Sequence, residues 1–209
     1  MMSAAGASRR LSATDRVAVL ISDLLAPPVS VFLICLVAGV AGRPHAWSGL
    51  VWGLVLAILC AAVPMSAVKL AKRRGTITTQ ESGWKRKRWL AFAVSAASIV
   101  CCVVLAVVFH APPLALWALA TMLVGLVATS AITAAGLKVS MHAFCLISLL
   151  MMLCVLFSTW WLVAVVLMVP LMLFARVHLG EHTAREVVVG SICAVLLVLL
   201  AAIVAPAAG

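Results

Sequence analysis

Long apolar runs separated by short polar segments make up most of this 209-residue chain. A helix needs about 20 apolar residues to cross the hydrocarbon core of a bilayer. On that measure the pattern predicts seven spanning helices, at residues 17–41, 47–68, 89–110, 113–136, 142–157, 159–175 and 187–207. The first run contains Asp23 and the pair Pro27 and Pro28, so we expect its helix to be broken. If this run lies at the membrane interface, six spans remain. The fifth and sixth runs are short, and we expect them to be tilted core helices that flank an apolar cavity.

Composition agrees with this pattern, since 67% of the residues are hydrophobic and 10% are charged. Soluble domains typically contain about 45–50% apolar and about 25% charged residues, so an ordinary soluble enzyme is excluded. Disorder is excluded as well, because it requires low hydrophobicity. The predicted fold class is therefore all-α, a polytopic helical bundle in the cell membrane. A basic N-terminal segment at 1–16 precedes one integral-membrane domain at 17–209.

The basic residues are distributed unevenly, and the formal net charge is +10. With seven spans, only Arg43 falls on one side of the membrane. The other fourteen of the fifteen Lys and Arg residues fall on the opposite side: Arg9, Arg10, Arg16, Lys69, Lys72, Arg73, Arg74, Lys85, Arg86, Lys87, Arg88, Lys138, Arg176 and Arg185. Basic residues in short loops stay in the cytoplasm, so the N-terminus and these loops are predicted to be cytoplasmic. The charge thus indicates orientation in the membrane and not a nucleic-acid partner.

The seven cysteines all lie inside apolar runs, and the chain contains no C-x-x-C pair. We interpret them as buried thiols that pack as small hydrophobic groups, and no metal site is predicted from them.

Two polar clusters lie at the ends of apolar runs, where ionisable groups are costly and often functional. The first contains Lys138, Ser140 and His142, and the second extends from Ala175 to Glu186. If a helix begins near Thr183, His182 and Glu186 lie one turn apart on the same face, so the carboxylate can orient the imidazole. Arg176, always charged and able to bind phosphate with two nitrogens, precedes a loop that contains Gly180.

A single basic residue or histidine at a membrane interface is more often an anchor, and His45 and His110 are given no functional role for that reason. The run of basic residues at 85–88 is likewise more often a topological signal than a site. Two clusters on one predicted face, each combining a histidine with a cation, favour a functional site instead.

The second cluster resembles the third signature of the type-2 phosphatidic acid phosphatase superfamily of membrane enzymes, which reads S-R-x5-H-x3-D. The corresponding residues here are Ala175 and Arg176, then His182 after five residues and Glu186 after three more. Glu186 stands where the signature has Asp. The resemblance covers about residues 80–205.

The other two signatures match less closely. Residues 140–142 (Ser-Met-His) resemble P-S-G-H, with Lys138 just before them. The segment that ends at Arg88 and Trp89 is a faint match to K-x6-R-P, with Glu81 in the place of its Lys. The order of the three elements agrees with the superfamily, as do the two spans between the second and the third.

The resemblance implies a role for each matching residue. His182 would be the nucleophile that forms a phosphohistidine, Glu186 would orient it, and His142 would protonate the departing lipid alkoxide and then help to activate water. His178, which lies off the signature, would be an accessory group or an interfacial residue. The phosphate would be bound by Arg176, Ser140, Lys138 and Arg88. No metal or other cofactor is required, because these cations stabilise the transferred phosphoryl group.

The preferred hypothesis is therefore a membrane phosphatase that hydrolyses a lipid phosphate or diphosphate at the cytoplasmic side. Isoprenyl phosphates, phosphatidic acid and phosphatidylglycerol phosphate are candidate substrates. The alternative is a membrane protein of the same fold that binds anionic lipid without catalysis, which the residues at positions 81 and 141 favour. A small transporter is a weaker interpretation, because only Asp23 lies within a predicted span. Membrane lipids are the expected partners, and the oligomeric state is not indicated by the sequence.

Overall fold

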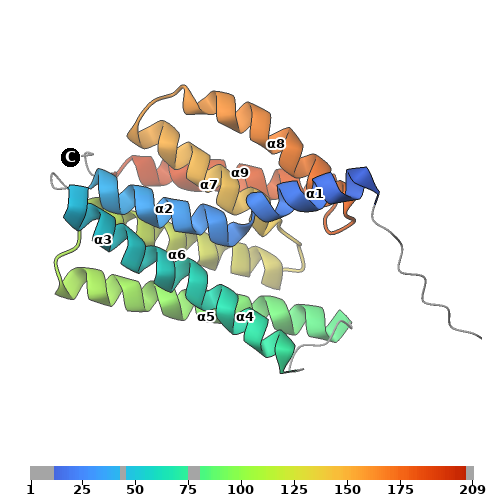
Figure 1. Ribbon diagram of the computed structural model, residues 1–209, viewed down its shortest axis with the longest axis horizontal. Coiled ribbons are helices and arrows are strands. Elements are labelled where there is room, and N and C mark those ends of the chain that lie inside the picture. The colour runs from blue at the N-terminus through green and yellow to red at the C-terminus, as the bar shows by residue number, and fades with distance from the viewer. Residues whose placement is uncertain (1–11, 43–45, 75–80, 206–209) are drawn as a thin grey trace, which may run out of the picture.

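The computed structural model describes residues 12–42, 46–74 and 81–205, and every regular element in these ranges is a helix. The elements in chain order are α1 (Ala13–Leu24), α2 (Pro27–Ala41), α3 (Ala46–Ala57), the π-helix η1 (Ile58–Ala62), α4 (Val63–Arg73), α5 (Glu81–Val108), α6 (Pro113–Ala134), α7 (Met141–Leu156), α8 (Trp161–His178) and α9 (Ala184–Ala202). The bundle they form is shown in Figure 1. The predicted all-α class is confirmed.

Seven passes run from one end of the bundle to the other. Helices α1 and α2 make the first pass, α3, η1 and α4 make the second, and α5 to α9 make one each. Six of the passes are long and apolar enough to cross a membrane, and α7 is a shorter apolar helix. The protein is thus a multi-pass integral membrane protein, as predicted.

Local chemistry explains the two interruptions. Ala26 is extended and Pro27 starts α2, which separates α1 from α2 within the first pass as predicted. In the second pass, Pro64 has no N–H to donate to the carbonyl four residues earlier, and the turn before it widens so that Val63 N–H donates to Ile58 O.

Several helix boundaries differ from the predictions, among them the starts of α1 and α5. Helix α1 begins at Ala13, inside the segment predicted to be polar, because Ser12 and Asp15 form a capping box at its start. Helix α5 begins at Glu81 and not at residue 89, because the helix continues from the apolar run into the basic sequence before it. The length of the apolar run therefore underestimates the length of the helix.

Helix α7 lies at the centre of the bundle, packed against α9, α8 and α2 (Figure 1). All of its residues from 143 to 153 are buried, and a helix that is apolar on every side is typical of such a position. The prediction that the fifth run is a core helix is confirmed. Elsewhere the backbones of α2 and α3 lie so close together that a Cβ on Gly39 would be 2.4 Å from Gly53 N.

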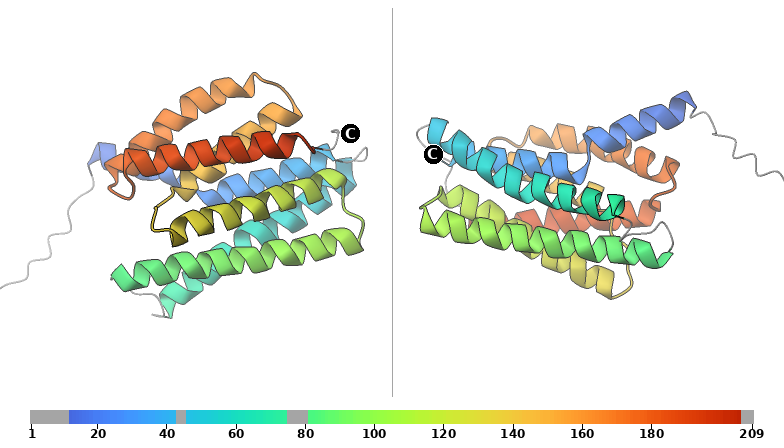
Figure 2. Two further views of the ribbon diagram at one scale, coloured as in Figure 1. Left: turned by 180° about the vertical axis from the view of Figure 1, so that it is seen from behind. Right: turned by 60° about the horizontal axis from the view of Figure 1, so that its bottom comes forward.

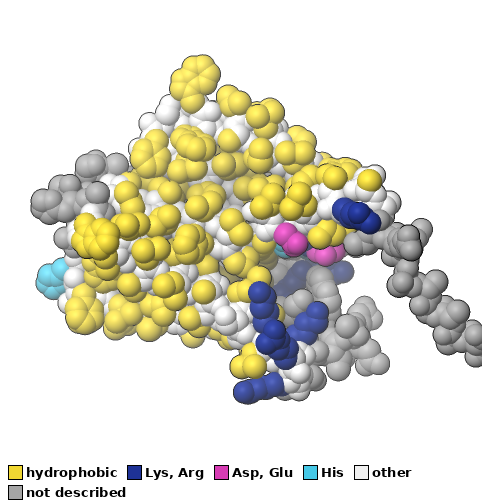
Figure 3. All heavy atoms as spheres, in the orientation of Figure 1, with side chains coloured by type: hydrophobic (Ala, Val, Ile, Leu, Met, Phe, Trp, Pro, Cys, Tyr) yellow, Lys and Arg dark blue, Asp and Glu magenta, His cyan; other side chains and the backbone are white. Residues whose placement is uncertain are grey.

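Charged side chains gather at one end of the bundle, here called the polar end, where α1 begins and the turn at 179–183 joins α8 to α9 (Figures 2 and 3). Apolar side chains cover most of the remaining visible face. The basic residues with described side chains all belong to helix ends or turns at the polar end: Arg16, Lys69, Lys72, Arg73, Arg74, Arg88, Lys138, Arg176 and Arg185. Arg9, Arg10, Arg43 and the side chains of Lys85, Arg86 and Lys87 lie outside the described part of the chain.

Candidate active site

The polar end brings the two predicted clusters together. The turn at 135–140 between α6 and α7 meets the start of α9, because Ser140 N–H donates to the carbonyl of Glu186 over 3.2 Å. Gly190 makes this approach possible, since a Cβ at that position would lie 2.7 Å from Ser140 O. Ser140 itself is fully buried.

His182 and Glu186 form the contact that their spacing predicts. Thr183 caps α9, and His182 Nδ1 lies 2.8 Å from Glu186 Oε2. Because the carboxylate can only accept, His182 carries its proton on Nδ1, and the lone pair of Nε2 is available for other chemistry. The imidazole is 6% exposed, and within the described residues Nε2 has no hydrogen-bond partner.

Glu186 has a second function that the sequence interpretation overlooked. Residues 183–186 read T-A-R-E, which is a capping box. Glu186 Oε2 accepts from Thr183 N–H and Glu186 N–H donates to Thr183 Oγ1, both over 3.3 Å. A longer carboxylate than Asp at this position therefore both caps α9 and reaches the imidazole of His182.

The surroundings of His182 favour its neutral form. Burial lowers the pKa of the imidazole below its usual value, and the positive charges of Arg176 and Arg88 act in the same direction. The hydrogen bond that His182 donates to Glu186 opposes them and raises the pKa, but the net shift is downward. These surroundings thus favour the neutral imidazole with its proton on Nδ1, the form in which Nε2 can act as a nucleophile.

Arg176, near the end of α8, is 4% exposed and lies at the centre of the site. Its Nη1 donates to Ser22 Oγ over 2.9 Å and lies 3.5 Å from His142 Nε2. Its Nη2 forms an ion pair with Glu181, and its Nε is buried with no partner among the described residues. A buried donor without an acceptor is uncommon and calls for an explanation.

The turn after α8 is organised around the backbone of Arg176. Its carbonyl accepts from the N–H groups of Glu181 and His182, each over 3.2 Å. Gly180 has a φ of +65°, a conformation that favours glycine and lets the chain reverse here. The predicted loop at Gly180 thus holds His182 beside Arg176.

The remaining predicted residues lie around this centre. The Ser140 hydroxyl is buried without a partner among the described residues. Lys138 interacts electrostatically with Glu186, and Arg88 interacts with both Glu186 and His182. The side chain of Glu81, the position of the first-signature Lys, is outside the described part of the chain.

Two residues at the polar end were not predicted to contact Arg176. Ser22 was missed because nothing in the spacing links α1 to α8, and Glu181 because its pairing depends on the turn at Gly180. His178, predicted to be an accessory group or an interfacial residue, pairs with Asp15 of α1 over 3.0 Å between Nε2 and Oδ1. It also stacks on Phe174, which gives it a structural position at the edge of the site.

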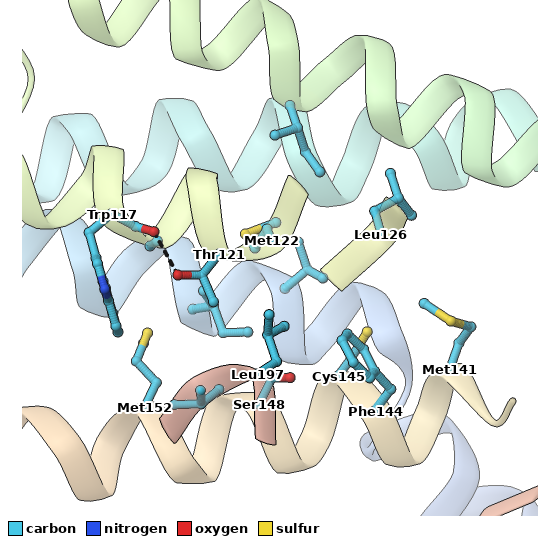
Figure 4. A pocket seen from close by; sticks show the side chains of 15 residues that line it. Trp117, Thr121, Met122, Leu126, Met141, Phe144, Cys145, Ser148, Met152 and Leu197 are labelled. Atoms are coloured by element: carbon cyan, nitrogen blue, oxygen red, sulfur yellow. Dashed lines mark hydrogen bonds between the residues drawn. The ribbon is translucent and has the colours of Figure 1, made fainter. Parts of the chain in front are cut away.

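An apolar cavity of about 80 Å³ lies inside the bundle, between α7 and helices α2, α5, α6 and α9 (Figure 4). It follows one face of α7 from Met141, which lies between Ser140 and His142 in the chain, through Phe144, Cys145 and Ser148 to Met152. No described residue of α8 lines this cavity. The cavity expected between the fifth and sixth spans is a narrow apolar hollow in the structure, too small to hold a water molecule and lined by Ile147, Val169 and Met172.

Within the described residues, no three His, Cys, Asp or Glu side chains converge in a way that could hold a metal ion. Comparisons of the chain with protein-family models, with curated proteins and with solved structures gave no match.

Proposed function

We propose that the protein is a membrane phosphatase that hydrolyses a lipid phosphate through a phosphohistidine at His182. The observation that carries this proposal is the pairing of His182 Nδ1 with Glu186, which leaves Nε2 unpartnered beside Arg176. The spacing of these three residues is also the part of the chain that resembles the type-2 phosphatidic acid phosphatases.

Two unsatisfied donors among the residues of the polar end support the binding of an anion. Ser140 Oγ and Arg176 Nε are two of the three buried side-chain atoms without a partner in the described chain, and both belong to residues predicted to bind phosphate. A phosphate oxygen would accept a hydrogen bond from each, which removes the cost of leaving them unpaired. Arg88 and Lys138 add positive charge nearby.

The proposed reaction proceeds in two steps. His182 Nε2 attacks phosphorus, an N–P bond forms, and the P–O bond to the lipid breaks as its oxygen takes a proton. His142 would supply this proton from its imidazolium form and would be neutral afterwards. Water then attacks phosphorus, its proton passes to His142, and inorganic phosphate leaves as the N–P bond breaks.

The substrate class follows from the cavity and the membrane location. The apolar cavity begins at Met141, next to the proposed phosphate site, and would accommodate part of an acyl or prenyl chain. Phosphatidic acid, phosphatidylglycerol phosphate and an isoprenyl diphosphate all combine such a chain with a phosphate group.

Phosphate release from these three lipids by the purified full-length protein in detergent tests the proposal. We expect wild-type protein to release inorganic phosphate and His182→Ala to release none. His178→Ala is the matched control. His178, the last residue of α8, is a nearby histidine that contacts Asp15 and not Arg176. Activity that survives in His182→Ala, or wild-type protein that is inactive on all three lipids, would refute the assignment.

One observation favours a second function, the binding of anionic lipid without catalysis. Both Nη atoms of Arg176 already have protein partners, Ser22 and Glu181, so the arginine is held in place without a reaction taking place at it. Wild-type protein that binds phosphatidic acid vesicles in a salt-dependent way, yet releases no phosphate, would support this alternative.

The orientation of the protein is part of the proposal. Basic residues gather at the polar end, and this distribution favours a cytoplasmic location for the site. Arg74, exposed at the end of α4, can be replaced by cysteine for labelling with a membrane-impermeant maleimide. We expect Arg74→Cys to react in inverted vesicles and not in intact cells, and labelling from outside would reverse the orientation.

A further inference from the structure

The guanidinium of Arg176 has two partners in very different surroundings. Ser22, which accepts from Nη1, is 6% exposed and belongs to α1, far from Arg176 in the chain. Glu181, which pairs with Nη2, has a side chain that is 53% exposed. One partner is therefore enclosed by the bundle, whereas the other can exchange its contact for water.

The geometry of the guanidinium adds a second difference. Nε and Nη2 lie on the same edge, the edge that binds a carboxylate or phosphate with two parallel hydrogen bonds. Glu181 contacts Nη2, while Nε is buried and unpartnered within the described chain. The edge is thus only half used, and an anion that offers two oxygens would satisfy both nitrogens.

The other side of the guanidinium is fixed by α1. Nη1 faces Ser22 Oγ and His142 Nε2, and all three groups are at least partly buried. Asp15 and Ser22 lie seven residues apart, two turns along α1, and contact His178 and Arg176 of α8. An N-terminal helix outside residues 80–205 therefore holds the arginine in place.

We propose that Ser22 is a positioning residue for Arg176 and that Glu181 is its displaceable partner, which the phosphate replaces on the Nε–Nη2 edge. This proposal rests on the proposed function in one respect, the binding of phosphate by Arg176. When phosphate binds, the Glu181 carboxylate moves into water, and it returns when inorganic phosphate leaves. Glu181 thereby weakens the binding of substrate and product by the same factor.

The two residues must act in opposite directions. Removal of the Ser22 hydroxyl leaves Nη1 without its buried acceptor, so the arginine is held less well and anions bind more weakly. Removal of the Glu181 charge eliminates an internal competitor, so anions bind more tightly. A role in folding alone would not produce effects of opposite sign on the same equilibrium.

Binding of inorganic phosphate to the purified full-length protein is the test, measured as the increase in thermal unfolding midpoint with phosphate concentration. For the loss of one hydrogen bond to a charged group, we expect Ser22→Ala to raise the Kd about tenfold and Glu181→Gln to lower it about tenfold. Ser22→Thr keeps a hydroxyl and should restore the wild-type Kd.

Matched controls separate these effects from a change in overall charge or packing. Asp23→Asn removes an exposed carboxylate next to Ser22, with no contact to Arg176 among the described residues, and Ser191→Ala removes a hydroxyl that donates to Val187 O. Neither should change the Kd. In Glu181→Gln, the Kd of dimethyl phosphate, a monoanion, should fall by the same factor as the Kd of phosphate. A larger fall for phosphate would mean that Glu181 stays in place and only repels the dianion.

The possible results distinguish this proposal from the phosphatase assignment. Weaker or unchanged phosphate binding in Glu181→Gln would overturn the displacement, and unchanged binding in Ser22→Ala would overturn the positioning role. The expected changes in Kd without any phosphate release from lipids would uphold the proposal and refute the enzyme. No binding of phosphate by any variant would overturn both.

Discussion

The polar end contains two half-sites that are built in different ways. The half-site around His182, with Thr183 and Glu186, comes from a single turn of chain. The half-site around Arg176 is assembled from α1, α7 and α8, through Ser22 and His142. The first is fixed by local backbone geometry, whereas the second exists only when three helices are docked. Substitutions in the two half-sites should therefore differ in their effects on stability and on catalysis.

The largest effect is expected in the local half-site, from Glu186→Gln. Glutamine also fits a capping box, so the unfolding free energy should change by less than about 0.5 kcal/mol. The imidazole loses the charge that fixes its tautomer, so kcat for phosphate release should fall about 10³-fold or more. Thr183→Ala is the reverse control, with about 1 kcal/mol less stability and little loss of kcat. Equal effects on stability from both variants would contradict the separation of orientation from capping.

The next effect concerns the assembled half-site. Arg176→Lys keeps the charge but loses the planar fork that contacts Ser22 and Glu181, so kcat/KM should fall about 10²-fold, mainly through a higher KM. Arg185→Lys, an exposed position in the first turn of α9, should leave both constants unchanged. A lysine variant with wild-type KM would show that the fork geometry is not used.

A third substitution tests the joint between the two half-sites. In Gly190→Ala the new methyl would meet Ser140 O, and the displacement of backbone should cost about 1–3 kcal/mol of stability. Gly53→Ala is the control, because its methyl would meet the backbone of Leu36 in α2, which belongs to neither half-site. Both variants should unfold at lower temperature, but only Gly190→Ala should raise KM. An unchanged KM would mean that the Ser140 turn is not part of the site.

The smallest effect is on the pH dependence. His182 must be neutral to attack phosphorus, and its pKa is lowered, so the acid limb of kcat/KM should lie below the usual pKa of histidine, about 6.5. Arg88→Gln removes a positive charge that lowers this pKa, so the acid limb should move to higher pH. Glu186→Gln removes a group that raises it, so the residual activity should show an acid limb at lower pH. Shifts of the opposite sign would exclude His182 as the titrating nucleophile.

The two half-sites also differ in how far the sequence predicts them. The contact between His182 and Glu186 follows from helical spacing alone. The break in the first pass follows in the same local way from Pro27. The Ser22–Arg176 contact does not, because the two residues are brought together by the packing of α1 on α8. Glu181 is adjacent to His182, yet its pairing with Arg176 depends on the turn at Gly180.

The same distinction applies to the fold. The lengths of the apolar runs predict the passes and the core position of α7, since each is a property of one segment. The larger cavity is a property of how five helices fit together, so no single segment indicates its place. The lengths of α4 and α5 were underestimated because helices continue beyond the apolar run into charged sequence.

The length of α7 has a consequence for the surrounding lipid. Its 16 residues rise about 24 Å at 1.5 Å per residue, whereas a bilayer core is about 30 Å thick. Trp160 and Trp161, just beyond its far end, are typical anchors at the opposite interface. If Trp160 and Trp161 lie at that interface, His142 and Ser140 would lie about 6 Å beneath the headgroups on the other side. We expect hydrophobic mismatch of this kind to thin the bilayer around the site, so that the phosphate of a lipid substrate would reach it without leaving the bilayer.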